Sequence, residues 1–194
     1  MKKYTRTVVV IVILAVLGVT YYYYLSNRTP KLDATDKSIV NEELAALTTR
    51  NIEENYPESV KEVVNLYMRI TKLYYTSSLS DEQIATLAKQ GRLLYDPELK
   101  SKQTDEEYLE ALKQDISDYK AVKRYISDFK LEGSSNVKYT TLDGKKYASI
   151  LALYYIREGS ELKYSYTKFT LRQDEAGHWK LLFWELADET DINE

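Results

Sequence analysis

The stretch KKYASILALYYIREGSELKYSYTKFTLRQ, residues 145–173, decides the fold of this chain. Apolar or aromatic side chains recur at every second position on both sides of Gly159 and Ser160. This alternation is typical of β-strands, and a Gly-Ser pair between two such runs is typical of a tight turn. The stretch therefore predicts two long antiparallel strands joined as a hairpin.

Further turns on either side extend this hairpin into a sheet. Asp143 and Gly144 form a two-residue hairpin turn with a strand at 137–142, and the DEAG segment at 174–177 leads into a last strand. The alternation at 127–132 predicts one strand more. We expect a continuous antiparallel meander of about five strands.

The positions of the turns also predict which residues lie opposite each other. The predicted pairs are Tyr155 with Tyr164, Leu153 with Tyr166, Leu151 with Lys168, Arg172 with Trp179, Lys168 with Phe183 and Tyr166 with Glu185. Because side chains alternate between the two faces of a sheet, this register assigns every strand residue to one face. One face is nearly all apolar and is expected to lie under the helices: Ala148, Ile150, Ala152, Tyr154, Ile156, Phe169, Leu171, Leu182, Trp184 and Leu186.

The opposite face mixes aromatic rings with a few charges. An antiparallel sheet with one solvated face alternates apolar and polar residues cleanly, whereas protein interfaces are enriched in aromatic residues and arginine. We therefore predict an interface formed by Tyr147, Leu151, Leu153, Tyr155, Tyr164, Tyr166, Lys168, Arg172, Trp179, Phe183 and Glu185. The alternative is a solvated face on which rings pack across strands and Arg172 stacks on Trp179.

Amphipathic helices are predicted upstream of the strands. A first helix is expected over 38–55, and the clearest helix begins at Pro57, because proline suits a first helical position. The apolar positions of this second helix recur at spacings of three and four: Val60, Val63, Tyr67, Ile70 and Tyr74. Such a stripe predicts a helix with one face buried against the sheet.

Two capping patterns predict further helices. Ser80 with Gln83 and Thr104 with Glu107 have the spacing of a capping box, in which each side chain bonds the other residue's backbone amide. The fold class is therefore α+β. After an N-terminal transmembrane helix, about four helices pack on one face of a curved antiparallel meander of about five strands.

Residues 1–28 form a basic head, an apolar run and an aromatic collar. Lys2, Lys3 and Arg6 precede an uncharged stretch at 7–27, which as a helix rises ~31 Å, about the hydrocarbon thickness of a bilayer. The predicted anchor residues are Val8, Ile11, Ile13, Leu14, Leu17, Tyr21, Tyr22, Tyr23 and Tyr24. The alternative is a cleaved secretory signal, but no Ala-x-Ala-like site follows the apolar run.

The anchor predicts an organisation and a location. Positive charge stays on the cytoplasmic side, so we expect a single-pass protein of the cell membrane with a cytoplasmic N-terminus. The predicted parts are the head and anchor at 1–28, a linker at 29–37, an extracytoplasmic cone-like domain at 38–188 and an acidic tail at 189–194. The chain has no cysteine, so this exported domain depends on its hydrophobic core.

Charge argues against a nucleic-acid partner. The whole chain carries a net charge of −3, and four basic residues and no acids lie within 1–28. Residues 29–194 therefore hold 23 basic against 30 acidic residues, a net charge of −7. Nucleic-acid binding requires a basic face, so none is expected.

No sequence pattern predicts catalysis, a metal site or a cofactor, so we expect a protein that is not an enzyme. His178 is the only histidine and falls at a predicted turn. Glu185, opposite Tyr166, is the one acid among rings and is either a general base or, more simply, the partner of a structural Tyr–Glu hydrogen bond. The other carboxylates examined fit solvated helix surface and caps: Asp105, Glu106, Glu107, Asp115 and Asp118.

The order of helices before a meander, over roughly residues 50–188, resembles the nuclear transport factor 2-like (cone) superfamily. The segment DEAGHWKL at 174–181 is similar to a hairpin common near the C-terminus of those domains. More closely, the anchor and NYPESVKEVV at 55–64 resemble a clostridial membrane-anchored family of unknown function. The superfamily resemblance implies helices closing over a bent sheet, often with a pocket between them.

Two functions follow as hypotheses. The first is a membrane-anchored extracytoplasmic interaction or scaffold module that forms a homodimer or binds a partner in a membrane complex, similar in architecture to bitopic scaffold subunits of type IV secretion machines. The alternative is a pocket for a small ligand or an enzymatic reaction, lined by Glu185 or tyrosines. Fold analogy alone does not choose between them.

Overall fold

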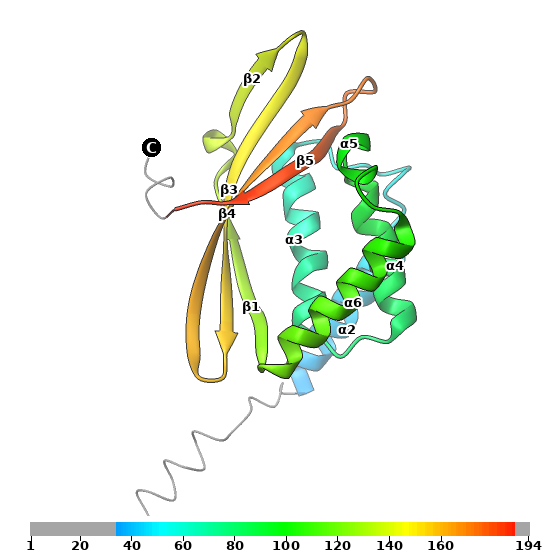
Figure 1. Ribbon diagram of the computed structural model, residues 1–194, viewed down its shortest axis with the longest axis vertical. Coiled ribbons are helices and arrows are strands. Elements are labelled where there is room, and N and C mark those ends of the chain that lie inside the picture. Colours follow the sequence, from blue (N-terminus) through cyan, green and yellow to red (C-terminus); the bar gives the residue numbers. More distant parts are fainter. Residues whose placement is uncertain (1–33, 189–194) are drawn as a thin grey trace, which may run out of the picture. The chain divides into compact units, whose positions relative to one another are not determined.

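The computed structural model describes residues 34–188, which form five helices and a five-stranded antiparallel sheet (Figure 1). The helices are α2 (Ala34–Thr48), α3 (Val60–Thr76), α4 (Asp81–Leu93), α5 (Pro97–Lys100) and α6 (Asp105–Ala121), and a short 3-10 helix covers Ser134–Asn136. The strands are β1 (Arg124–Leu131), β2 (Lys138–Leu142), β3 (Lys145–Glu158), β4 (Glu161–Gln173) and β5 (Trp179–Leu186). The α+β fold class is confirmed.

Contacts divide the chain into two compact units, residues 1–37 and 38–194, and the sheet with α3 to α6 belongs to the second. The predicted anchor, most of the predicted linker and the predicted acidic tail lie outside the described residues.

Helix α3 is the central helix of this unit. Its predicted apolar stripe is confirmed, because Val60, Val63, Tyr67, Ile70 and Tyr74 are all buried. The helix begins at Val60 and not at Pro57, because the Ser59 hydroxyl accepts a hydrogen bond from the Glu62 amide at 3.2 Å and so caps the first turn.

The other helices agree with the sequence predictions, with two exceptions. Both predicted capping boxes form, at Ser80 with Gln83 and at Thr104 with Glu107. The first helix ends at Thr48 and does not continue to residue 55. The four-residue α5 was not predicted; Asp96 caps it by accepting from the Glu98 amide at 2.9 Å.

The sheet is a meander only from β2 to β5. Strand β1 does not pair with β2; both pair with the same edge of β3, β2 along its first half and β1 along its second. The predicted continuous meander is therefore wrong at its first connection. The predicted turn between β2 and β3 is confirmed, because Asp143 and Gly144 both have positive φ, 50° and 74°, as the hairpin turn requires.

The register of β3 with β4 is the predicted one. Tyr155 pairs with Tyr164, Leu153 with Tyr166 and Leu151 with Lys168. These pairs follow from the two-residue turn alone, because nothing interrupts the ladder between the strands.

The predicted register of β4 with β5 is wrong, because the connecting loop extends to His178 and β5 contains a bulge. Leu171 pairs with Leu181 and Thr170 with Phe183, so Leu182 is an extra residue without a partner on β4. Before the bulge the register differs from the predicted one by one residue, with Trp179 opposite Gln173, and beyond the bulge it differs by two, with Lys168 opposite Glu185. The predicted pairs of Arg172 with Trp179, Lys168 with Phe183 and Tyr166 with Glu185 do not form.

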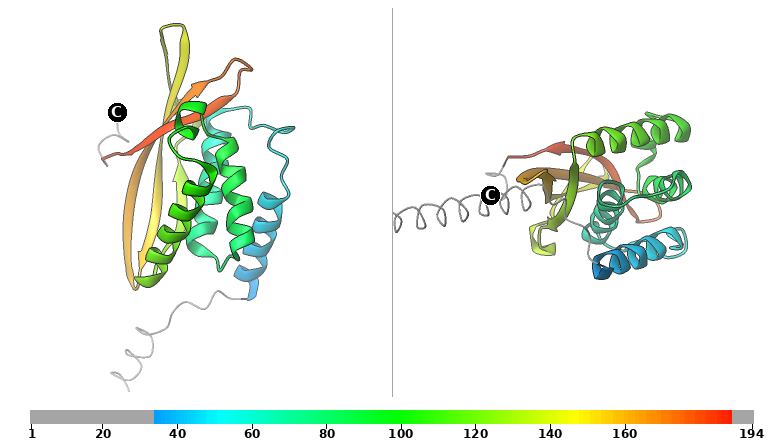
Figure 2. Two further views of the ribbon diagram at one scale, coloured as in Figure 1. Left: turned by 45° about the vertical axis from the view of Figure 1, so that its right-hand side comes forward. Right: turned by 90° about the horizontal axis from the view of Figure 1, so that it is seen from below.

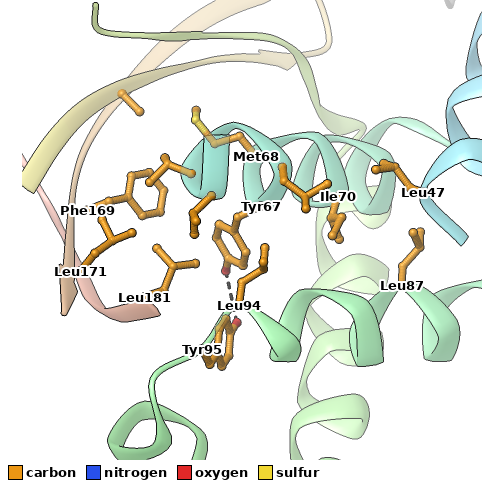
Figure 3. Close-up of a cluster of buried hydrophobic side chains, with 14 of the residues drawn as sticks. Leu47, Tyr67, Met68, Ile70, Leu87, Leu94, Tyr95, Phe169, Leu171 and Leu181 are labelled. Carbon is orange, nitrogen blue, oxygen red and sulfur yellow. Dashed lines mark hydrogen bonds between the residues drawn. The ribbon is translucent and has the colours of Figure 1, made fainter. Parts of the chain in front are cut away.

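The helices cover one side of the sheet, with α3 against β1, β3 and β5 (Figure 2). Figure 3 shows the centre of the resulting core, where Tyr67 of α3 lies among Phe169, Leu181 and Leu94. The apolar side chains of this core are almost entirely excluded from solvent, with Leu171 and Leu181 at 0% exposure. Burial of one such side chain stabilises the fold by about 1.5–3 kcal/mol.

One edge of the sheet is fastened to the helices by main-chain and ionic contacts. Tyr95, just before α5, forms a parallel bridge with Leu181 of β5, and the Asp96 amide donates to the Leu181 carbonyl at 2.8 Å. Arg172 of β4 then forms a bidentate ion pair with the Asp96 carboxylate, with Nε to Oδ2 at 2.9 Å. Arg172 is therefore held by Asp96 and does not stack on Trp179.

We predict that Asp96→Asn lowers the free energy of unfolding by about 3 kcal/mol, because it leaves the Arg172 guanidinium without its buried anion. The Asp96 side chain is only 3% exposed. Chemical denaturation of the purified chain measures the change. The matched control is Asp128→Asn, which breaks the ion pair of Lys72 with a carboxylate that is 68% exposed and should cost less than about 1 kcal/mol. Equal losses in the two variants would contradict the prediction.

Candidate functional site

A cavity of about 410 Å³ opens between the helices and the concave face of the sheet. Its wall is formed by side chains of α3, α6 and four strands: Tyr67, Thr71, Tyr75, Tyr119, Ile126, Tyr154, Ile156, Ser165, Thr167, Phe169, Trp184, Glu185 and Leu186. We call this the aromatic pocket. Its volume lies in the range of small-ligand sites.

Regular spacing within each element brings these residues together. On α3, Tyr67, Thr71 and Tyr75 are four residues apart and therefore lie on one stripe of the helix. On β4, Ser165, Thr167 and Phe169 alternate and share the face that points toward the helices. The bulge in β5 places Trp184 opposite Phe169 on this same face.

Ring contacts hold the floor of the aromatic pocket. The Trp184 ring centroid lies 5.3 Å from that of Tyr67 and 6.3 Å from that of Phe169, and Tyr67 meets Phe169 edge to face at 5.9 Å. Tyr67 and Phe169 are buried, whereas Trp184 is 40% exposed. The indole therefore connects the packed core with the open part of the pocket.

Two tyrosines whose rings are tilted by 42° to each other lie between α3 and α6 at the edge of the pocket. The rings of Tyr75 and Tyr119 lie 4.4 Å apart. The Tyr75 hydroxyl donates a hydrogen bond to the Asp115 carboxylate, and burial together with this carboxylate raises the pKa of Tyr75. The Arg124 guanidinium lies 5.0 Å from the centroid of the Tyr119 ring.

Among the residues that line the aromatic pocket, Glu185 carries the only formal charge. Its carboxylate lies 3.5 Å from the Lys168 ammonium group, and both side chains are about half exposed. Glu185 is therefore not buried among rings opposite Tyr166 as predicted; it lies beside Lys168 at the rim. In the β4–β5 ladder Glu185 pairs with Lys168 and not with Tyr166, and the Glu185 and Lys168 side chains form an ion pair.

His178 lies outside the aromatic pocket. It follows the β4–β5 turn, where its ring is 4.5 Å from Tyr56 and its Nδ1 atom is 3.7 Å from the Asp174 carboxylate. The side chain is 44% exposed. Within residues 34–188, no group of three His, Cys, Asp or Glu side chains is placed to hold a metal ion.

The predicted interface residues divide into two groups. Most of them do share the sheet face that points away from the helices. On β3 and β4 these residues are Tyr147, Leu151, Leu153, Tyr155, Tyr164, Tyr166, Lys168 and Arg172, and on β5 they are Phe183 and Glu185. Trp179 does not: it pairs with Gln173, is only 9% exposed and lies 5.6 Å from the Tyr139 ring. Leu181, two residues further along β5, pairs with Leu171 and is also buried.

Internal contacts account for several residues of this outer face. Leu151 is buried, and Arg172 is bound to Asp96 and Glu98. A smaller cavity of about 240 Å³ lies there, between residues 132–138 and the end of β5. Tyr164 remains 56% exposed and Phe183 41% exposed. An interface on this face stays a prediction.

Sequence reasoning missed most of the aromatic pocket. Of the lining residues on the helices, only Tyr67 is predicted from the sequence to belong to a buried stripe, and Thr71, Tyr75 and Tyr119 receive no role. Thr71 lies four residues after Tyr67 and four residues before Tyr75, so the three side chains share one face of the helix. A polar threonine at this position is the sequence signal for a cavity, because a fully packed helix face favours aliphatic side chains.

Residues 1–184 match the model of a protein family described as a domain of unknown function, DUF6715. The chain belongs to this family. A search of curated proteins finds no match to this DUF6715 member. No helix among residues 34–188 is long and apolar enough to span a membrane.

Buried tyrosines predict how stability depends on pH. Burial raises the pKa of Tyr67, Tyr74, Tyr95 and Tyr108 above the usual value of 10.0. Their neutral form is therefore favoured in the folded state, and the resulting stability is complete below pH 10 and falls as the pH rises further. The slope is about 1.4 kcal/mol per pH unit for each such tyrosine.

We expect tyrosinate absorbance at 295 nm to rise in a cooperative step above pH 10 that coincides with loss of the helical circular dichroism signal. Ionisation of all nineteen tyrosines with an unchanged dichroism spectrum would contradict this prediction.

Proposed function

We propose that this chain is a membrane-anchored, extracytoplasmic binding protein whose aromatic pocket holds a small organic ligand. The observation that carries the proposal is a cavity of about 410 Å³ lined by rings and hydroxyl groups on the concave side of the sheet. Ligand sites are concave, mostly apolar and equipped with a few polar groups that orient the ligand. Ser165 is such a group here, and the Thr71 hydroxyl, which donates to the Tyr67 carbonyl at 2.9 Å, can still accept a hydrogen bond.

The aromatic pocket is a better-supported site than the interaction surface predicted from the sequence. Leu151 and Trp179 are buried and Arg172 is engaged with Asp96, so the outer face offers fewer free side chains than expected. The pocket residues, in contrast, surround space that the protein itself does not fill. We therefore place binding of a small ligand ahead of the scaffold role.

The arrangement of helices over the concave side of a twisted sheet, with a cavity between them, supports the proposal that the domain is cone-like and related to the nuclear transport factor 2-like superfamily. The clostridial resemblance rests on the anchor and on residues 55–64 and remains part of the proposal. The membrane location rests on the basic head and the apolar run within 1–28.

We predict that a ligand of the aromatic pocket changes the fluorescence of Trp184. The chain has two tryptophans, and Trp179→Phe leaves Trp184 as the only reporter, on the pocket wall. A panel of phenol, glucose, choline and benzoate is titrated into this variant of the full-length chain in nanodiscs. At least one compound should shift the emission and raise the melting temperature, because binding to the folded state stabilises it.

Ser165→Trp fills the aromatic pocket and should abolish both effects. The matched control is Thr140→Trp, at an exposed strand position that does not line the pocket. No response to any compound of the panel, or a response that persists in Ser165→Trp, contradicts the proposed function.

The absence of cysteine gives a direct test of membrane topology. A membrane-impermeant maleimide should label Ser134→Cys, at the exposed start of the short 3-10 helix before β2, on intact cells. Thr5→Cys, in the basic head, should react only after the cells are permeabilised. Labelling of both variants on intact cells, or recovery of the protein in the soluble fraction, contradicts the anchored arrangement.

A further inference from the structure

Strand β2 forms an exposed edge of the sheet. Among the described residues it pairs only with β3, and all five of its residues are exposed, with Tyr139 and Leu142 each at 62%. The hairpin that β2 forms with the start of β3 extends beyond the helices (Figures 1 and 2). An edge strand of this kind presents N–H and C=O groups to which another strand can bind.

Other parts of the sheet are covered where β2 is not. Helix α3 packs against β1, where the Thr76 hydroxyl donates to the Ile126 carbonyl, and residues 94–96 pair with Leu181 in the first half of β5. Proline and bulges, which commonly block the addition of a strand, do not occur in β2, and its only charge is Lys138. Its other four residues include a tyrosine and two threonines, which favour strands.

The turn between β2 and β3 determines which backbone groups of β2 are free. The residues that flank a two-residue hairpin turn, here Leu142 and Lys145, exchange both hydrogen bonds, and bonded and non-bonded pairs then alternate along the ladder. The amide and carbonyl groups of Tyr139 and Thr141 therefore point away from β3. Two such residues, two positions apart, match the spacing of an antiparallel ladder.

These groups are self-complementary about Thr140. If a second copy of β2 runs antiparallel about a two-fold axis at Thr140, Tyr139 of each copy lies opposite Thr141 of the other, and both pairs are hydrogen-bonded ones. Thr140 lies opposite its own copy, which is a favourable cross-strand pair. Lys138 lies opposite the uncharged Leu142 of the second copy, so all five residues are paired and no like charges meet.

We infer that two copies of this chain join through β2 in a two-fold dimer, with one sheet continuing across the axis. A pair of five-residue strands buries far less than the roughly 1,600 Å² of a typical stable interface, so the dimer is weak in dilute solution. Confinement of the chain to a membrane, as proposed above, raises its effective concentration and favours the dimer there. The pairing requires no ligand in the aromatic pocket.

The absence of cysteine makes disulfide trapping a specific test. In a non-hydrogen-bonded pair the Cα atoms lie about 4.5 Å apart, so full-length Thr140→Cys in isolated membranes should form a disulfide-linked dimer under mild oxidation. The two copies of residue 138 lie about 14 Å apart in this arrangement, which is beyond the reach of a disulfide.

Lys138→Cys is therefore the matched control, at an exposed position of the same strand and the same sheet face. It should give at least roughly tenfold less dimer than Thr140→Cys, because of that distance. Coexpression of Lys138→Cys with Leu142→Cys should restore the dimer, because these two residues lie opposite each other across the axis.

Thr141→Pro tests the hydrogen bonds of the pairing. It removes an amide that points away from β3, so the β2–β3 ladder and the circular dichroism spectrum should not change. Added to Thr140→Cys, it should lower the yield of dimer several-fold, whereas Thr141→Ala, which keeps the amide, should not.

Three outcomes would overturn the inference. Equal dimer yields from Thr140→Cys and Lys138→Cys would show random collision, and an unchanged yield with Thr141→Pro would show that no strand pairs there. Trapping of Tyr164→Cys without trapping of Thr140→Cys would assign the contact to the outer face of the sheet, where Tyr164 is 56% exposed.

Discussion

The rest of the structure depends on the burial of one face of α3 in the concave side of the sheet. The helix supplies Val60, Val63, Tyr67, Ile70 and Tyr74 to the interior, and each of these side chains is at most 9% exposed. Burial of side chains of this size contributes about 1.5–3 kcal/mol each, so no other element of the domain contributes as much apolar contact from a single stripe. The domain has no cysteine and depends on this contact where a smaller exported domain would use disulfides.

The same contact determines where the aromatic pocket lies. At the middle of α3, Tyr67 meets Phe169 and fills the space under the sheet. One and two turns later the stripe continues with Thr71 and Tyr75, whose side chains line the aromatic pocket. The opposite end is closed by Asp96, which holds Arg172 of β4 across the edge of β5.

Tyrosine gives the pocket its chemistry because its ring is apolar and its hydroxyl is polar. Tyr67, Tyr95 and Tyr108 form a chain of hydroxyl contacts at 3.4 Å within the core, and Tyr75 uses Asp115 in the same way at the surface. These partners satisfy the hydroxyls inside the protein, while the rings of Tyr67 and Tyr95 pack in the core.

Turn chemistry and alternation in the sequence were sufficient to predict the α+β class, the hairpins and the register of β3 with β4, because each of these follows from residues close together along the chain. Capping boxes located the starts of α4 and α6 for the same reason. Only the tertiary structure decided that β1 joins β3 beside β2, and that Leu182 is extruded so that Leu181 and Trp184 both face the helices. A bulge satisfies packing against distant side chains, here Tyr67 and Phe169, and no local pattern in the strand records that requirement.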